Sequence, residues 1–205
     1  MRICFLGDSF VNGTGDPDCL GWVGRVCAAA RHQGVDLTAY NLGIRREMSA
    51  ELAARWQGEV ALRLPPDVDG RLVFSFGVND TTLEEGEARQ PRVAPAESLT
   101  NARSILVAAR RRPILLVGPP PVAQFPRNRP IARLSAALAE LCDELAVPYL
   151  DTYTPLSSSP VWMSEVALGD GSHPGAGGYA ILASLVQRWV AWRAWLDGTP
   201  PVAGN

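Results

Sequence analysis

The chain contains no lysine, and all 19 of its basic residues are arginines. This absence excludes an enzyme that works through a lysine Schiff base, and it excludes a phosphate-binding loop of the Gly-x-x-x-x-Gly-Lys type. The formal net charge of −2 argues against a dedicated nucleic-acid-binding protein, which usually carries a basic surplus. We therefore expect no nucleic-acid partner.

Cysteine is scarce, and its four copies show no Cys-x-x-Cys spacing and no neighbouring pair of histidines. A zinc site is therefore not expected, and Cys4 and Cys27 fit apolar patterns as small core residues. The sequence also lacks a long apolar span, and no basic and apolar leader precedes its first predicted strand. These absences predict a cytoplasmic protein with reduced thiols and no insertion into a membrane.

The composition is that of a globular protein, with 47% apolar and 20% charged residues in a chain of 205. This length suffices for one domain with a full hydrophobic core. We find no internal repeat and no composition shift that would mark a second domain. The prediction is a single domain over residues 1–198, followed by a flexible tail over 199–205 that contains two prolines and a glycine.

Apolar runs of strand length alternate with segments of helical periodicity along the whole chain. The predicted strands are the run that begins at Ile3 and stops at Gly7-Asp8-Ser9, then Leu37–Leu42, Arg71–Phe76, Pro113–Gly118 and Val147–Asp151. The predicted helices cover 20–33, 49–64, 95–112, 131–146 and 177–196. This alternation predicts an α/β fold of three layers (α/β/α), in which helices cover both faces of a five-stranded parallel sheet. Right-handed crossovers favour the flavodoxin-like strand order 2-1-3-4-5.

Residues suited to catalysis or ligand binding lie where the predicted strands end. Ser9 follows the first strand, Gly43 the second and Asn79 the third, while Asp170 and His173 precede the last helix. Ligands of open parallel sheets bind at the carboxyl edge of the strands. We therefore expect these five residues to meet at one edge of the sheet.

This set of residue types fits nucleophilic catalysis. The three-residue spacing lets the Asp170 carboxylate accept the Nδ1–H of His173, which leaves Nε2 free to take the proton of Ser9. A serine needs such a base, since its hydroxyl alone is a weak nucleophile. The backbone N–H groups of Ser9 and Gly43 and the side-chain amide of Asn79 could then form an oxyanion hole.

Four short motifs, in order along the chain, resemble the blocks of the SGNH or GDSL-type hydrolases. They are Gly7-Asp8-Ser9, Gly43, Gly77-Val78-Asn79-Asp80 and Asp170-x-x-His173, and the likeness extends to the glycine-rich helix start that ends at Tyr179. The resemblance implies an α/β/α fold and hydrolysis of esters or thioesters with no cofactor. It assigns the four name-giving roles to Ser9, Gly43, Asn79 and His173, with Asp170 completing the triad. The Gly-x-Ser-x-Gly elbow of the α/β-hydrolases is absent.

The residues after Gly43 depart from the small or hydroxyl residues usual in that family. Here the sequence continues with Ile44, Arg45, Arg46 and Glu47. Two arginines beside the site could hold an anionic part of the substrate, a carboxylate or a phosphate. The alternative is that they form surface pairs with Glu47 or with later acidic residues.

Two long segments at the same edge are the expected walls of the substrate pocket. They are Gly118–Pro130, with Phe125, and Thr152–Gly169, with Trp162. Asp8 is a further candidate for substrate contact, and its alternative role is to cap the segment that follows it. Surface linkage by proline-rich chain is the other interpretation of the two walls.

Three functions remain open at this stage. The first is an esterase or thioesterase for small or medium acyl groups, and the second is a deacetylase of a carbohydrate or another polar ester. The third is a flavodoxin-like module whose Gly7–Gly15 loop binds an anion or nucleotide, although a binder has no need of a catalytic base. The sequence does not identify the substrate, and it does not distinguish hydrolysis from acyl transfer. Three tryptophans on the last predicted helix, Trp189, Trp192 and Trp195, fit either core packing or a contact in a homo-oligomer. His32, at a predicted helix end, receives no catalytic role.

Overall fold

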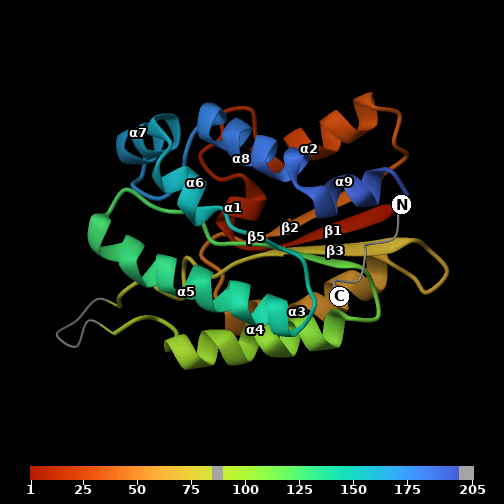
Figure 1. Cartoon of the computed structure of the whole chain (residues 1–205), viewed down its shortest axis with the longest axis horizontal. Helices are drawn as coiled ribbons and strands as arrows, with labels where there is room; N and C mark the ends of the chain where they lie inside the picture. The colour runs from red at the N-terminus through yellow and green to blue at the C-terminus, as the bar shows by residue number, and fades with distance from the viewer. Residues whose placement is uncertain (85–89, 199–205) are drawn as a thin grey trace.

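The computed structural model describes residues 1–84 and 90–198, and one parallel sheet forms the centre of this part of the chain (Figure 1). Its five strands lie in the order β2-β1-β3-β4-β5, which confirms the predicted fold and strand order. The strands are β1 (Arg2–Gly7), β2 (Thr38–Gly43), β3 (Gly70–Ser75), β4 (Ile114–Val117) and β5 (Tyr149–Leu150). The tail predicted over 199–205 lies outside the described residues.

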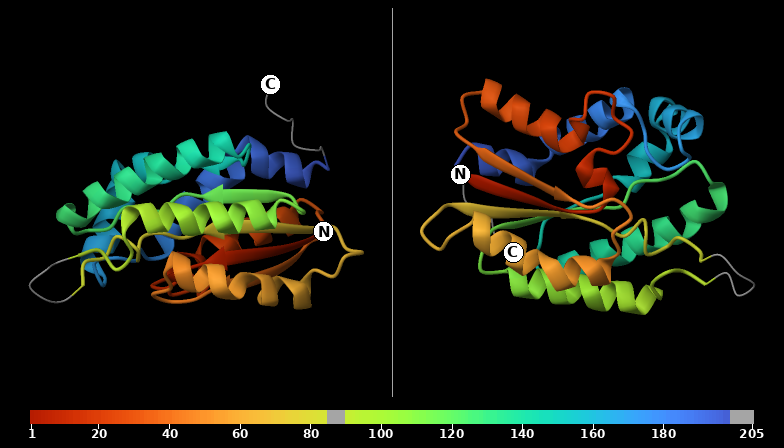
Figure 2. Two further views of the ribbon diagram at one scale, coloured as in Figure 1. Left: turned by 90° about the horizontal axis from the view of Figure 1, so that it is seen from below. Right: turned by 180° about the vertical axis from the view of Figure 1, so that it is seen from behind.

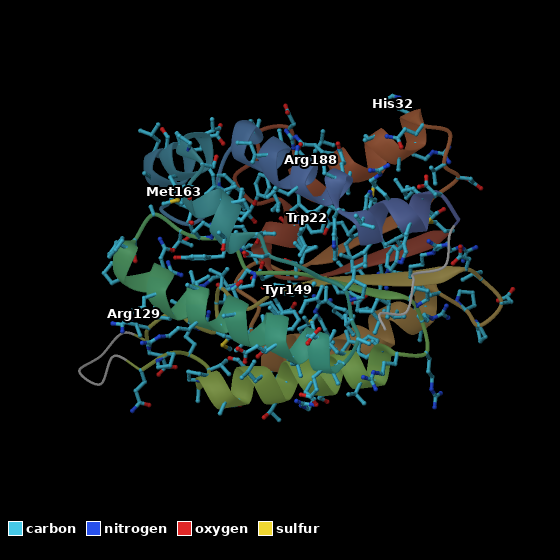
Figure 3. All side chains as sticks on the ribbon, viewed as in Figure 1. Trp22, His32, Arg129, Tyr149, Met163 and Arg188 are labelled. Carbon is cyan, nitrogen blue, oxygen red and sulfur yellow. The ribbon has the colours of Figure 1, made fainter. Side chains whose placement is uncertain are left out.

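Helices cover both faces of the sheet, as the views from below and behind also show (Figure 2). One face carries α2 (Gly21–His32), α8 (Ala176–Arg188) and α9 (Val190–Leu196), and the other α3 (Ser49–Arg63), α4 (Pro95–Ala109) and α5 (Phe125–Glu144). Successive residues of β1 point to opposite faces, so Ile3 joins the core under α2 and Cys4 the core under α3. This double burial explains why the strand is apolar at every position from Ile3 to Leu6. Trp22 fills the layer between the sheet and the helices α8 and α9 (Figure 3).

Three short helices near the carboxyl edge of the sheet were not predicted from the sequence pattern. They are α1 (Ser9–Asn12), α6 (Tyr153–Ser157) and α7 (Pro160–Leu168). A helix of one or two turns offers too few apolar positions for its periodicity to be recognised. The segment 152–169 is thus helical rather than an open loop, with Ser159 accepting the Trp162 N–H at the start of α7.

Two predicted helices have different bounds in the structure. Helix α5 begins at Phe125 rather than Ile131, because Pro126 lies in the first turn, where its missing N–H costs no hydrogen bond. The last helix is broken at Trp189, whose extended backbone (ψ 126°) separates α8 from α9. Trp192 and Trp195 beyond this break are buried in the core.

The register of the strands brings their ends to one level. Gly7, the last residue of β1, pairs with Gly43 of β2 and Ser75 of β3. The segments that follow these three strands therefore leave the sheet side by side. Among the described residues, we find no helix with the length and apolar character that crossing a bilayer requires.

Candidate active site

Ser9 is the first residue of α1, directly after β1. The Asp8 carboxylate caps this helix, with Oδ1 accepting the Phe10 N–H at 2.9 Å. The N–H groups of a first helical turn have no partner within the helix, so the Ser9 N–H is available for another acceptor. Ser9 itself is buried, and its hydroxyl is aimed at His173.

Asp170, His173 and Ser9 form a chain of hydrogen bonds. Asp170 Oδ1 accepts the backbone N–H groups of Ser172 and His173, each at 2.9 Å. The other carboxylate oxygen, Oδ2, lies 2.7 Å from Nδ1 of the His173 ring. Nε2 on the far side of the ring lies 2.7 Å from Ser9 Oγ. The structure thus brings together the three residues predicted as a triad, in an arrangement that can move a proton from serine to histidine.

The surroundings of Asp170 keep its carboxylate charged. Burial raises the pKa of the Asp170 carboxyl group. Hydrogen bonds from the backbone N–H and the ring of His173, and from the Ser172 N–H, outweigh this and lower the pKa to about 2. A carboxylate that stays ionised can hold the imidazole ring in place and stabilise the imidazolium that proton transfer creates.

Aromatic side chains pack against the His173 ring. The centroid of the Phe10 ring lies 4.9 Å from that of the His173 ring, and the Trp162 ring stacks on Phe10 with 6.3 Å between ring centroids. The Trp162 indole N–H donates to the Pro121 carbonyl at 3.0 Å, and the side chain is 0% exposed. The prediction that Trp162 lines the substrate pocket is therefore wrong, because this side chain has no free surface.

Gly43 lies where the chain has no room for a side chain. A Cβ atom there would come within 2.2 Å of the Asn12 backbone nitrogen. The Gly43 N–H, a predicted oxyanion donor, donates to Asn41 Oδ1 at 3.1 Å. Asn41 in turn donates to the Val11 carbonyl at 2.8 Å, which ties β2 to α1. The sequence analysis gave Asn41 no role.

Asn79 and Asp80, which are adjacent in the loop after β3, have different hydrogen-bond partners. The Asn79 amide donates to the Glu47 carbonyl at 3.1 Å and lies 3.5 Å from Asp8 Oδ2, which places it beside the Ser9 turn. Asp80 Oδ1 accepts the N–H of Ser49, the first residue of α3, at 2.8 Å. Asp80 therefore has a structural role, because its carboxylate caps a helix.

Three buried carboxyl groups lie beneath the Ser9 turn: Asp8, Glu47 and Asp80. Burial, together with the charges of Asp80 and Glu47, raises the pKa of Asp8 to about 7. Burial also raises the pKa of Glu47, although its ion pair with Arg55 opposes this. Asp8 is a helix cap inside the protein, and the prediction that it contacts substrate is wrong.

Three arginines approach the outer side of the site. Arg45 Nη2 lies 3.6 Å from Asp170 Oδ2, so this arginine pairs with a later acid rather than with Glu47. Arg46 is exposed, and its carbonyl accepts from Arg92 at 3.4 Å. Arg127 of α5, which the sequence analysis missed, donates to Thr82 Oγ1 at 2.8 Å and Ser172 Oγ at 3.4 Å.

An open cleft of about 630 Å³ borders the loop that carries Asp170 and His173. Its lining includes His173, Asp170, Arg45 and, from the second predicted wall, Leu168. Phe125 does not line this cleft: it is 86% exposed at the first position of α5, where its ring faces solvent. The contribution expected from Phe125 is therefore not found.

The glycine-rich start of α8 is explained by Glu165 of α7. The Glu165 carboxylate accepts the N–H groups of Gly177, at 3.2 Å, and Gly178, at 2.7 Å. A Cβ on Gly177 would lie 2.5 Å from Glu165 Oε1, so a larger residue there would displace the carboxylate from these N–H groups. The contact fixes the helix that directly follows His173.

In the described part of the chain, no three histidine, cysteine, aspartate or glutamate side chains gather in a way that could hold a metal ion. The other histidine, His32, ends α2 and lies far from the Met163 region of α7 (Figure 3).

Comparison with protein families matches the GDSL-like lipase/acylhydrolase family over residues 5–181. A search of curated protein sequences finds no match. The matched range contains all four motifs noted in the sequence.

Solved structures share the fold over nearly the whole chain. A lipase/acylhydrolase from Enterococcus faecalis superposes with a TM-score of 0.75 at 22% identity, covering 94% of this chain and 96% of its own. Axe2, an acetylxylan esterase from Geobacillus stearothermophilus, gives 0.74 at 21% identity, with 91% and 92% covered. The psychrotrophic esterase EstA from Pseudoalteromonas, in a structure inhibited by monoethylphosphonate, gives 0.71 at 16% identity, with 96% and 98% covered. At these identities the likeness shows the fold alone.

The family match covers most of the chain, and the hydrogen-bonded serine, histidine and aspartate lie within it. The chain therefore belongs to the GDSL-like lipase/acylhydrolase family and is an ester-hydrolysing enzyme of the SGNH fold.

Proposed function

We propose that the enzyme cleaves carboxylic esters or thioesters through a triad of Ser9, His173 and Asp170 and an acyl-enzyme intermediate. The observation that carries this proposal is the continuous chain of contacts from Asp170 Oδ2 to Nδ1 of His173 and from Nε2 to Ser9 Oγ, both at 2.7 Å. A flavodoxin-like binding module would not need such a chain, and this argues for the enzyme over the binder.

The geometry gives each residue a part in the reaction. Ser9 Oγ bonds to the carbonyl carbon while its proton passes to Nε2 of His173. The tetrahedral intermediate collapses when the bond to the leaving oxygen or sulfur breaks and the imidazolium returns the proton to that atom. Water then attacks the acyl group on Ser9 with His173 as base, which releases the acid and restores the serine. Asp170 holds Nδ1–H throughout.

The oxyanion hole of this proposal consists of the Ser9 N–H, the Gly43 N–H and the Asn79 amide. All three donors stand at the ends of β1, β2 and β3, which the register aligns. The Asn41 oxygen holds the Gly43 N–H in the structure, and the Glu47 carbonyl holds the Asn79 amide. The charged oxygen of the intermediate is a stronger acceptor than either of these neutral groups, so the donors favour the transition state.

For the substrate we propose a polar ester with a negative charge near the reacting group. Arg45 stands against Asp170, and Arg127 is half-buried with hydroxyl oxygens as its hydrogen-bond partners. Neither arginine belongs to the proposed catalytic chain. Arg45 lines the cleft and can meet an anion there, while Arg127 lies beside Ser172 of the loop that precedes His173. Deacetylation of a carbohydrate is the second candidate, favoured by the shared fold with an acetylxylan esterase.

The test is a substrate panel with purified enzyme. It comprises p-nitrophenyl esters of increasing chain length, matched neutral and carboxylate-bearing esters, an acyl-CoA, and acetylated xylo-oligosaccharides. We expect Ser9→Ala to abolish turnover of every substrate, and Arg45→Ala to raise KM for the anionic esters only. Equal changes in KM for neutral and anionic esters would contradict the proposed charge preference. The cytoplasmic location expected from the sequence stays a prediction.

A further inference from the structure

Arg55 lies on α3, outside the four motifs, yet its guanidinium reaches the ends of β1 and β2. Nη2 donates to the Leu42 carbonyl at 2.7 Å and lies 3.4 Å from the Gly7 carbonyl. The same group binds the Glu47 carboxylate through two contacts, Nε to Oε1 and Nη2 to Oε2, the second at 2.6 Å. The Arg55 and Glu47 side chains are only 18% and 3% exposed. A buried pair of this kind needs its additional hydrogen bonds, and here they go to the backbone of the site.

The first consequence concerns the Gly43 N–H. The Leu42 carbonyl and the Gly43 N–H belong to one peptide unit, which is planar and rigid. Arg55 holds the carbonyl end of this plane, and Asn41 accepts from the N–H end at 3.1 Å. The direction of the Gly43 N–H is therefore fixed by a guanidinium on a neighbouring helix.

The second consequence concerns the Asn79 amide. Its hydrogen bond to the Glu47 carbonyl, at 3.1 Å, sets the direction in which the amide points. The Glu47 residue is in turn held by the two contacts of its carboxylate with Arg55. One arginine thus restrains the backbone beside Gly43 and the acceptor that orients Asn79.

We propose that Arg55 is a positioning residue for the oxyanion hole: it sets the directions of the Gly43 N–H and the Asn79 amide from behind, without touching substrate. This inference rests on the oxyanion hole of the proposed function. An arginine suits the task because its planar fork can bind both oxygens of a carboxylate and still donate to a carbonyl. A lysine has the charge but lacks this fixed geometry.

The test compares Arg55→Gln and Arg55→Lys with a matched control, Arg112→Gln. Arg112 is also a half-buried arginine that donates to backbone carbonyls, those of Leu64, Pro65 and Val68, but these lie at the amino edge of the sheet. We expect Arg55→Gln to lower kcat for p-nitrophenyl acetate by about 10–100-fold with KM changed by less than about threefold, since the loss falls on the transition state. Arg55→Lys should lose less, and Arg112→Gln should keep kcat while lowering the melting temperature.

A double variant separates positioning from loss of stability. If Arg55 acts through the hole, Arg55→Gln combined with Asn79→Ala should lose less kcat than the product of the two single losses. An unchanged kcat in folded Arg55→Gln, an equal loss in Arg112→Gln, or a full product in the double variant would each overturn the inference. If Arg55→Gln does not fold, Arg55→Lys decides by the same split between kcat and KM. Wild-type enzyme that fails to react with a fluorophosphonate at Ser9 would instead overturn the proposed function.

Discussion

Replacing Asp8 with asparagine should change how the stability of the enzyme depends on pH. Asparagine has the shape of aspartate and is an equally good helix cap, so its side-chain oxygen can still accept the Phe10 N–H. The substitution removes the ionisable group and replaces Oδ2, which lies 3.5 Å from the Asn79 amide, with an NH2 group. This second change does not titrate, so it shifts the stability of the variant by the same amount at every pH. Because Asp8 is buried near Asp80 and Glu47, its pKa is raised from 3.8 to about 7.

The sign and size of the effect follow from this shift. Between pH 4 and 7 the folded protein keeps a proton on Asp8 that the unfolded chain has released, so the free energy of unfolding falls as pH rises. A shift of about three pKa units corresponds to roughly 4 kcal/mol over the whole range, at about 1.4 kcal/mol per unit. Roughly 2–3 kcal/mol of this falls between pH 5 and 8. Asp8→Asn should not show this loss.

The assay is urea unfolding of wild type and Asp8→Asn at pH 5, 6, 7 and 8. The free energy of unfolding of the variant, minus that of wild type, should grow by roughly 2–3 kcal/mol from pH 5 to 8. Asp16→Asn is the control: burial raises the pKa of Asp16, but Arg25 and the Asp18 and Gly21 N–H groups bring it below 3.8. Its difference from wild type should therefore be constant over this range. A constant difference for Asp8→Asn as well would refute the reasoning.

Three further substitutions test the site. Asn79→Ala should lower kcat by about 10²–10³ with KM nearly unchanged, since the amide serves the developing oxyanion; a lowered melting temperature with normal kcat would make Asn79 structural. Gly43→Ala should lower the melting temperature and should lower kcat at least tenfold, because a Cβ cannot lie 2.2 Å from the Asn12 backbone nitrogen. A normal kcat would contradict this. His173→Ala should abolish ester hydrolysis while His32→Ala preserves it, as initial rates on p-nitrophenyl acetate will show, and the reverse outcome would remove His173 from the mechanism.

The sheet was predictable because its signal is repeated along the chain. Each strand is an apolar run of the expected length, and the helices between them require parallel pairing and right-handed crossovers. The short helices α6 and α7 were missed for the opposite reason, since one or two turns carry little periodicity. The start of α5 was placed late because residues 125–130 were assigned to the proline-rich segment Gly118–Pro130, although Pro126 lies in the first turn of the helix and Pro130 lies inside it.

The residues proposed to touch the reacting atoms were easier to predict than those that support them. Ser9 and His173 carry chemistry that few other positions could supply, and they stand at element boundaries. The fully buried Trp162 and the capping role of Asp8 depend on which way each side chain turns, which spacing alone does not report. The sequence gives no signal for the role of Arg55, because the site groups that it contacts are backbone carbonyls, one of them 48 residues away, and backbone groups are the same at every position.

The central claim is that Ser9 is a nucleophile activated by His173. It is tested most directly by treating the purified enzyme with a fluorophosphonate and measuring the intact mass and the labelled peptide. The account predicts one adduct per chain, located on Ser9, with no labelling of Ser9→Ala and very slow labelling of His173→Ala. An adduct on another residue, or equally fast labelling of His173→Ala, would contradict it.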